Sequence, residues 1–229
     1  MKHDGSAGIP IVAARVFGER LALAERYAHM LATEGVERGL IGPRETDRIW
    51  DRHLLNCAAV GELIAPGTRV ADVGSGAGLP GIPLAIARPD LEITMIEPML
   101  RRTTFLQDVI DQLGLESVLV LRHRAEERVV LEHADFDFAT SRAVASLDKL
   151  TRWTMPLLKA NGIMLALKGD RAQAEVEEHG TLMASLGVAS VKVMRCGVEY
   201  LDPPATVVVA QRSAELGRQK RKTPSRRGR

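Results

Sequence analysis

Apolar residues near the start of the chain recur with the spacing of amphipathic helices. Steps of three and four residues join two series, Phe17, Leu21, Ala24, Ala28 and Leu31, and then Trp50, Leu54, Cys57, Gly61 and Ile64. Residues at this spacing share one helix face, so each series predicts a helix that packs through one side. The segment "EGVERGLIGPRE" between them is typical of a loop, and "APGT" at 65–68 ends the second helix. We therefore expect a helical extension over residues 15–65.

Beyond Pro66 the pattern changes to short apolar runs that alternate with segments of helix length. This alternation predicts βαβ units and a largely parallel sheet. The last two strands are separated only by "GVEYLDPPA", which is too short for a crossover helix and predicts an antiparallel hairpin. The sequence thus indicates a Rossmann-like α/β domain over residues 66–212. The expected strands are 69–73, 91–97, 117–122, 135–141, 161–168, 188–196 and 205–212, and the expected helices are 80–88, 99–113, 146–159 and 170–186.

Charge divides the chain into a mildly acidic body and a basic end. The net charge is only +2, yet residues 212–229 contain eight Lys and Arg and one Glu. Because that end holds almost no apolar residues, we expect 213–229 to be a disordered tail. Such a tail serves either solubility or electrostatic contact with nucleic acid. Residues 1–14 are expected to be a flexible N-terminus.

The composition argues against several classes of protein. No apolar run approaches the roughly 20 residues that span a bilayer, and the start of the chain lacks a secretory signal, which favours the cytoplasm. Cys57 and Cys196 show neither metal-ligand spacing nor the density of a disulfide framework. We expect both to be buried packing residues. The six histidines also lack ligand spacing, so we expect no metal.

A glycine-rich segment, "VADVGSGAGLPG" at 70–81, directly follows the first expected strand. A literal G-x-G-x-x-G pattern fits Gly76, Gly78 and Gly81 and would indicate an NAD(P)-dependent oxidoreductase. That pattern requires its first glycine at the strand end, whereas the apolar run ends at Val73. The oxidoreductase remains an alternative. The register D-x-G-x-G-x-G, from Asp72 to Gly78, fits the strand better.

In the favoured register the loop is suited to an adenosine-bearing cofactor. Glycines allow a tight turn and close approach of a ligand to the backbone. Glu97 ends the next strand and can accept hydrogen bonds from both ribose hydroxyls. An acid beside the turn suits a cationic sulfonium better than a pyrophosphate, which favours S-adenosylmethionine over a nicotinamide cofactor. The loop residues predicted to contact the cofactor are Asp72, Gly74, Ser75, Gly76 and Gly78.

Five segments together resemble one bacterial family, the small-subunit ribosomal RNA methyltransferase G family, also called glucose-inhibited division protein B. The likeness covers about residues 45–170 and is most specific in "GLPGIPLAI". The segments are "DRHLLNCAAV" (51–60), "ADVGSGAGLPGIPLAI" (71–86), "IEPMLRRTTFL" (96–106), "SRAVASL" (141–147) and "LALKG" (165–169).

The resemblance implies a class I methyltransferase fold and an enzyme that uses S-adenosylmethionine. Its implied substrate is N7 of a guanine in 16S rRNA near the decoding site, where streptomycin acts, within the 30S subunit or an assembly intermediate. A monomer is expected. The resemblance places cofactor contacts at Gly74, Leu79, Ala125, Glu126 and Arg142, with Glu97 on the ribose. A non-enzymatic RNA-binding module that relies on the basic tail is a further alternative.

The chemistry of this reaction needs positioning more than acid–base catalysis. Guanine N7 carries an unprotonated lone pair, so its attack on a sulfonium methyl needs no general base, and alignment dominates. Basic side chains at the carboxyl ends of parallel strands can align the reactants, which favours Arg142 and Lys168. The expected RNA contacts are Arg52, His53, Arg101, Arg102 and Lys168. We expect Trp50 and Trp153 to be core residues.

Overall fold

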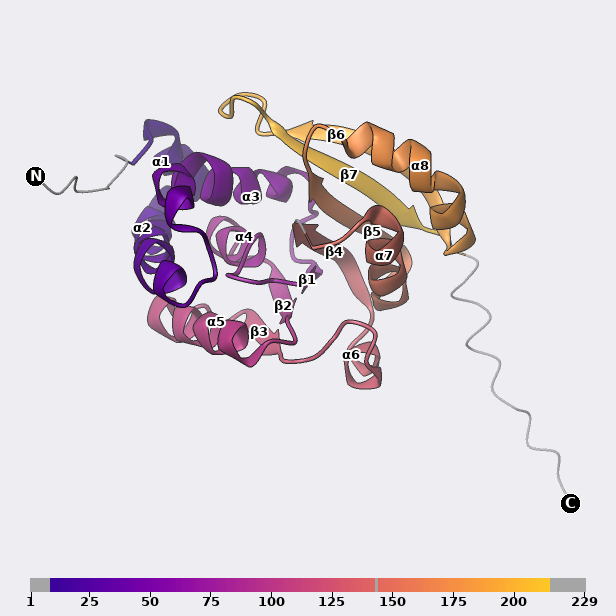
Figure 1. Cartoon of the computed structure of the whole chain (residues 1–229), viewed down its shortest axis with the longest axis horizontal. Helices are drawn as coiled ribbons and strands as arrows, with labels where there is room; N and C mark the ends of the chain where they lie inside the picture. Colours follow the sequence, from indigo (N-terminus) through magenta and orange to yellow (C-terminus); the bar gives the residue numbers. More distant parts are fainter. Residues whose placement is uncertain (1–8, 143, 215–229) are drawn as a thin grey trace, which may run out of the picture.

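The computed structural model describes residues 9–142 and 144–214 and contains a seven-stranded sheet (Figure 1). The strand order is β3-β2-β1-β4-β5-β7-β6, in which β7 runs antiparallel to both of its neighbours. The expected parallel sheet with a terminal hairpin is therefore confirmed. The strands are β1 (Arg69–Val73), β2 (Glu92–Ile96), β3 (Val118–Leu121), β4 (Phe136–Arg142), β5 (Leu158–Lys168), β6 (Val188–Cys196) and β7 (Ala205–Arg212).

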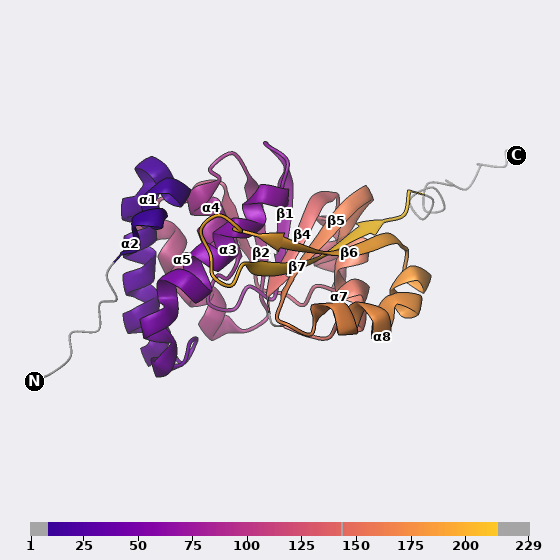
Figure 2. The same cartoon turned by 90° about the horizontal axis from the view of Figure 1, so that it is seen from above.

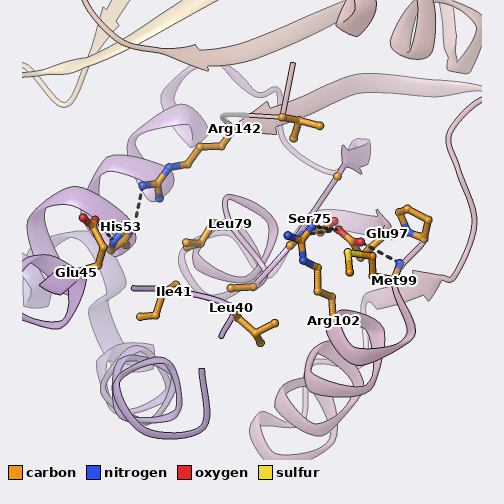
Figure 3. Close-up of a pocket in the computed structure, with 15 residues that line it drawn as sticks. Leu40, Ile41, Glu45, His53, Ser75, Leu79, Glu97, Met99, Arg102 and Arg142 are labelled. Atoms are coloured by element: carbon orange, nitrogen blue, oxygen red, sulfur yellow. Dashed lines mark hydrogen bonds and ion pairs between the residues drawn. The ribbon is translucent and has the colours of Figure 1, made fainter. Parts of the chain in front are cut away.

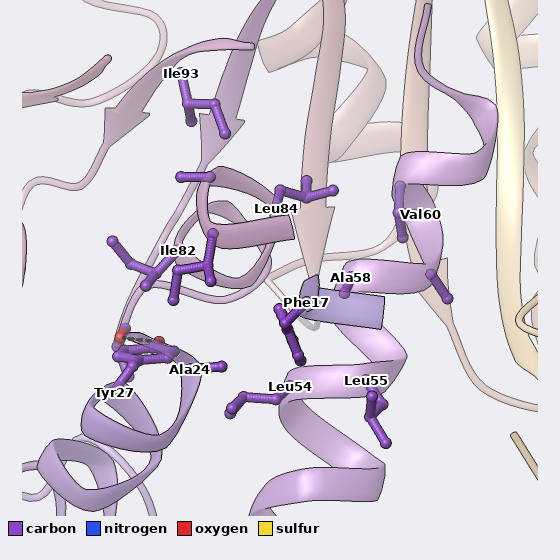
Figure 4. Close-up of a cluster of buried hydrophobic side chains, with 14 of the residues drawn as sticks. Phe17, Ala24, Tyr27, Leu54, Leu55, Ala58, Val60, Ile82, Leu84 and Ile93 are labelled. Atoms are coloured by element: carbon purple, nitrogen blue, oxygen red, sulfur yellow. Dashed lines mark hydrogen bonds between the residues drawn. The ribbon is translucent and has the colours of Figure 1, made fainter. Parts of the chain in front are cut away.

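Helices cover both faces of this sheet (Figures 1 and 2). The apolar side chains buried between helices and sheet form two separate cores. One core lies under the N-terminal helices, α4 and α5, and includes Tyr27, Ile82 and Ile93 (Figure 4). The other lies under α6, α7 and α8. The α-helices are α1 (Ile11–Phe17), α2 (Leu21–Met30), α3 (Asn56–Ala58), α4 (Gly81–Ala87), α5 (Leu100–Leu113), α6 (Arg128–Glu132), α7 (Leu147–Thr154) and α8 (Ala172–Ser185).

The N-terminal extension is helical, as expected, but its helices are irregular. A helix already begins at Ile11, inside the segment expected to be flexible. Two π-helical stretches, Leu31–Gly35 and Ile49–Leu55, continue into or out of α-helix. At the far end, the Glu62 carboxylate accepts hydrogen bonds from the backbone N–H of Gly197 and from Tyr200, which joins the extension to the loop between β6 and β7.

Three elements of the α/β domain differ clearly from the sequence expectations: α7, β5 and α6. The expected helix at 146–159 ends at Thr154 and is followed by a 3₁₀ turn, Met155–Leu157. Pro156 lacks a backbone N–H, so it cannot continue the α-helical hydrogen-bond ladder, and β5 starts earlier, at Leu158. The short helix α6 was not expected, because five residues are too few to show helical periodicity. Among the described residues, no helix is long and apolar enough to cross a membrane.

Tyr27 anchors the glycine loop to helix α2. Its buried hydroxyl donates to the carbonyl of Ala77 across 2.8 Å. Tyr27→Phe leaves that carbonyl without its partner, so we expect the free energy of unfolding to fall by about 1–2 kcal/mol. Urea denaturation measures this loss. Tyr200→Phe is the matched control, because the Tyr200 hydroxyl lies in an exposed contact and its loss should cost under about 0.5 kcal/mol. Equal losses in both variants would contradict the anchoring role.

Candidate active site

A cavity of about 500 Å³ opens at the carboxyl end of β1 (Figure 3). The glycine loop forms part of its wall. Gly74 and Gly76 have φ angles of +72° and +58°, a left-handed conformation that glycine adopts without strain. The cavity is lined by Leu40, Ile41, Glu45, His53, Gly74, Ser75, Gly76, Ala77, Leu79, Glu97, Pro98, Met99, Arg102, Arg142 and Val144.

Asp72 does not line this cavity. Its carboxylate is fully buried beneath the loop, where it accepts the backbone N–H of Gly81 at 3.2 Å and the Thr140 hydroxyl at 3.3 Å. Burial raises the pKa of Asp72 to about 7, although these two hydrogen bonds act in the opposite direction. Asp72 therefore stabilises the turn through these hydrogen bonds. Its burial does not support the direct contact with the cofactor that the sequence predicts.

The second and third glycines of the literal G-x-G-x-x-G pattern pack against protein. A Cβ on Gly78 would lie 2.6 Å from Ile82 Cγ1, and a Cβ on Gly81 would lie 2.5 Å from Met95 Cε. These glycines are therefore needed for close packing of the loop, α4 and β2. The geometry supports the register that starts at Asp72 and does not support a dinucleotide fingerprint. Gly78 is a packing residue and lines neither this cavity nor the smaller one beside it.

Glu97 lies opposite the glycine loop, at the end of β2. Its carboxylate accepts the backbone N–H of Gly76 at 3.1 Å and that of Met99 at 3.0 Å. Arg102 approaches the same group at 3.3 Å. Each carboxylate oxygen has two lone pairs. Those of Oε2 are engaged by Gly76 and Arg102, whereas one on Oε1 stays available for a further donor. The backbone thus holds Glu97 in place as an acceptor on the cavity wall.

A smaller cavity of about 100 Å³ adjoins the first. Gly74, Pro98 and Val144 line both cavities and form the boundary between them. Ala125 and Glu126, which follow β3, line the smaller one. Trp153 also lines the smaller cavity and packs against the second core. It is therefore only partly the core residue that the sequence predicts. Trp50 is buried, as expected, and contacts Phe17 edge to face.

Arg142 is held at the cavity by the N-terminal extension. One guanidinium nitrogen lies 2.7 Å from His53 Nδ1, and another lies 3.3 Å from the Cys57 sulfur. The other ring nitrogen of His53 lies 3.0 Å from Glu45 Oε2. Burial, together with the adjacent guanidinium, lowers the pKa of His53 to about 4, so the imidazole is neutral near pH 7. Burial raises the pKa of the Cys57 thiol.

The remaining basic residues expected at the site are distributed unevenly. Arg102 lines the cavity. Lys168 does not, because its amine is bound to the Ala145 carbonyl at 2.8 Å and to Glu175 at 2.7 Å; it fixes the loop after β4. Arg101 and Arg52 are exposed outside the cavity wall. Both cysteines are buried, as expected.

Apart from His53, sequence reasoning missed the part of the cavity that the extension supplies. Leu40, Ile41 and Glu45 lie in the segment expected to be a loop, and Met99 and Val144 follow strands. The segment "GLIGPRE" shows no periodicity that would mark it as part of a site. Its one available signal was a pair of apolar residues in an otherwise polar loop.

Comparison with known proteins identifies the family. The family model described as rRNA small subunit methyltransferase G matches residues 20–201. Proteins named ribosomal RNA small subunit methyltransferase G are 61% identical in Mycobacterium marinum, over 94% of this chain and 95% of the relative, and 57% identical in Mycolicibacterium smegmatis, over 100% and 98%. This chain is thus similar to both relatives over nearly their whole length.

Solved structures agree on the fold at much lower identity. A precorrin-6y C5,15-methyltransferase from Geobacter metallireducens aligns with a TM-score of 0.52 at 15% identity, over 76% of this chain and 90% of its own. A SAM dependent methyltransferase from Aquifex aeolicus aligns with a TM-score of 0.53 at 17% identity, over 78% and 97%. The fold is thus that of methyltransferases, and the chain belongs to the rRNA small subunit methyltransferase G family.

Proposed function

We propose that this protein transfers a methyl group from S-adenosylmethionine to N7 of a guanine in 16S rRNA. The observation that carries the proposal is the cavity itself. A left-handed glycine turn and a backbone-held carboxylate face each other at the carboxyl ends of β1 and β2, where α/β sheets bind ligands. Membership of an rRNA methyltransferase family supplies the substrate class.

The residues present fit the methyl donor. Gly74 has no side chain between the two adjoining cavities, so an elongated ligand can lie across it. Glu97 offers a free lone pair on Oε1 to one ribose hydroxyl, and a second hydroxyl can take the place of Arg102 on Oε2. Ala125 and Glu126 line the smaller cavity, which suits the adenine ring. Ser75 and Leu79 would face the methionine portion in the larger cavity. Asp72 would act indirectly, because it holds the turn in shape.

The reaction needs no proton transfer from the acceptor atom. The donor supplies a methyl group on a positively charged sulfur: as the N7 lone pair forms a bond to carbon, the carbon–sulfur bond breaks and its electrons stay on sulfur. The protein's contribution is then to orient the base and exclude water, and good alignment is worth up to about 7–11 kcal/mol of the barrier. Arg142, which the extension fixes at the cavity, is suited to this positioning.

The RNA would approach across the rim of the cavity. Arg52 and Arg101 are exposed near it and can contact phosphates, which contribute affinity with little sequence information. Lys168 is engaged within the protein and is better assigned to holding the loop after β4. The basic tail is a further candidate for RNA contact, although residues 215–229 lie outside the described part of the chain.

Labelled S-adenosylmethionine and 30S subunits from a strain that lacks this methylation test the proposal. We expect label in 16S rRNA and chemical strand scission at a single guanine carrying the N7 methyl group. Naked 16S rRNA in a parallel reaction shows whether the subunit is required. If the protein binds S-adenosylhomocysteine but labels neither substrate, the proposed substrate is wrong.

Glu97→Gln tests the donor site independently of RNA. The amide offers one acceptor oxygen where the carboxylate offers two, so it cannot satisfy the two backbone N–H groups and the ribose together. We expect the affinity for S-adenosylhomocysteine, measured by calorimetry, to fall roughly ten- to a hundredfold. Glu92→Gln on the same strand is the matched control, since Glu92 is exposed and away from both cavities. An affinity of Glu97→Gln within about twofold of the control would contradict the ribose role.

A further inference from the structure

The end of the cavity farther from the glycine loop is built by the N-terminal extension. Figure 3 shows Glu45 and His53 on one side and Ser75 and Glu97 on the other, with Leu79 between them. A donor that occupies the loop and Glu97 leaves the opposite end open. The acceptor base must enter there, because its reactive nitrogen has to meet the methyl group inside one continuous cavity.

Hydrogen bonding in this end has a fixed direction. A guanidinium can only donate, so Arg142 donates to His53 Nδ1, and the ring proton must lie on Nε2. That N–H donates to Glu45 Oε2. The neutral imidazole therefore holds a carboxylate on one side and a guanidinium on the other. The cavity thus presents an acceptor group and a donor group at neighbouring positions.

The Glu45 carboxylate has capacity left for a ligand. Within residues 9–142 and 144–214, its polar contacts all involve Oε2, which meets His53 at 3.0 Å and Arg52 at 3.5 Å. Oε1 has no partner among those residues. The side chain is 32% exposed and lines the cavity, so a ligand in the cavity can reach it.

Guanine matches this arrangement through its Watson–Crick edge. N1–H and the N2 amino group are adjacent donors, and O6 beside them is an acceptor. Adenine presents a lone pair at N1 and a donor at its 6-amino group, which is the opposite order. A carboxylate therefore attracts guanine and repels adenine at this position. Enzymes that modify bases read an extruded base through this edge while apolar side chains flank its faces.

We propose that Glu45 selects guanine as the acceptor base by accepting hydrogen bonds from N1–H and the N2 amino group. Arg142 then faces O6, and N7 on the adjacent edge points towards the donor. The apolar side chains of Leu40, Ile41 and Leu79 flank the ring. This inference rests on the proposed function, because it assigns the specificity of the same cavity. His53 acts through its neighbours, as a positioning residue for both charged groups.

The experiment compares guanosine with inosine at the target position of 16S rRNA reconstituted into 30S subunits. Inosine lacks only the N2 amino group and keeps N1–H, O6 and N7. A hydrogen bond to a charged group predicts that the wild-type protein has a kcat/KM roughly ten- to a hundredfold higher for guanosine. In Glu45→Gln the amide oxygen can still accept from His53, but the charge is gone. We expect its guanosine-to-inosine ratio to fall to within about threefold of unity, since the charged acceptor is lost.

Two controls separate this loss from a general defect. Glu45→Gln should bind S-adenosylhomocysteine with the wild-type affinity, because Glu45 lies away from the glycine loop. Glu34→Gln, in the same extension but paired with Arg38 outside the cavity, should keep the full guanosine preference.

The outcomes distinguish the specificity claim from the proposed function. A wild-type protein that labels no guanosine would refute the proposed function itself. Equal rates of the wild-type protein on guanosine and inosine would refute the role of the N2 contact without any variant. A wild-type ratio retained in Glu45→Gln would show that another residue reads the base.

Discussion

Gly74→Asp is expected to abolish measurable binding of S-adenosylhomocysteine. A Cβ at this position would lie 2.7 Å from Val144 Cγ2, and the φ of +72° is strained for any side chain. The carboxylate would also project where the two cavities meet. We expect the affinity to fall at least about 100-fold, which corresponds to about 2.7 kcal/mol, and methylation of 30S subunits to be lost with it.

Gly114→Asp is the matched control for Gly74→Asp. Gly114 ends α5 with a φ of +63°, and a Cβ there would have no neighbour within 4 Å. This variant carries the same backbone strain and the same added charge, so its effect should be confined to stability. Calorimetry and a thermal melt on both variants distinguish the two effects. If both bind S-adenosylhomocysteine equally well, the loop is not the donor site.

The sheet was predictable because its strands are marked by composition and by length. Uninterrupted apolar runs such as "VLVL" and "VVVA" indicate buried strands, and β1, β6 and β7 have the expected bounds. The "VLVL" strand β3 is nevertheless an edge strand in which Leu119 is 50% exposed, so it is not covered on both faces. Helix ends were less predictable. The end of α7 depends on one proline, and α6 is shorter than two helical turns, so periodicity gives it no signal.

The site was predictable mainly where residues lie at the carboxyl ends of strands. The glycines and Glu97 follow strands, so the topology alone brings them together at one edge of the sheet. The tasks of Asp72, Gly78 and Lys168 depend on which way each side chain or loop packs, and a pattern of residue types does not contain that information. The extension's part of the cavity depends on long-range packing of a loop, which the sequence does not mark.

The extension and the sheet depend on each other at the site. Tyr27 of α2 holds the glycine loop, and His53 holds Arg142 at the end of β4. Both contacts join residues at least 50 positions apart in the chain. The extension therefore shapes the donor end of the cavity as well as the base end. Loss of the Tyr27 contact should therefore lower donor affinity, and loss of the His53 contact should change base specificity.

Two buried groups are expected to give opposite pH dependences of stability. Asp72 has a pKa of about 7 in the folded state, against about 3.9 for an unfolded Asp. Between these pH values the folded state binds more protons than the unfolded state. The contribution of Asp72 to the free energy of unfolding is therefore greatest below pH 4 and is lost as pH rises through 7. His53 has a folded pKa of about 4, against about 6.5 unfolded, so its contribution is lost as pH falls.

Asp72→Asn should therefore reveal a pH dependence of the free energy of unfolding that is largely cancelled in the wild-type protein. In the wild type the two slopes, each up to about 1.4 kcal/mol per pH unit, oppose one another between about pH 4 and 6.5. Without Asp72, the free energy of unfolding should rise with pH across that window; in His53→Gln it should fall. Urea denaturation at half-unit steps from pH 4.5 to 8 measures both. Carboxyls with a lowered pKa, such as Asp90 and Asp137, change the free energy of unfolding mainly at pH values below this window. Parallel curves for wild type and Asp72→Asn would show that Asp72 is ionised throughout, and that the buried acid braces the glycine turn as a carboxylate.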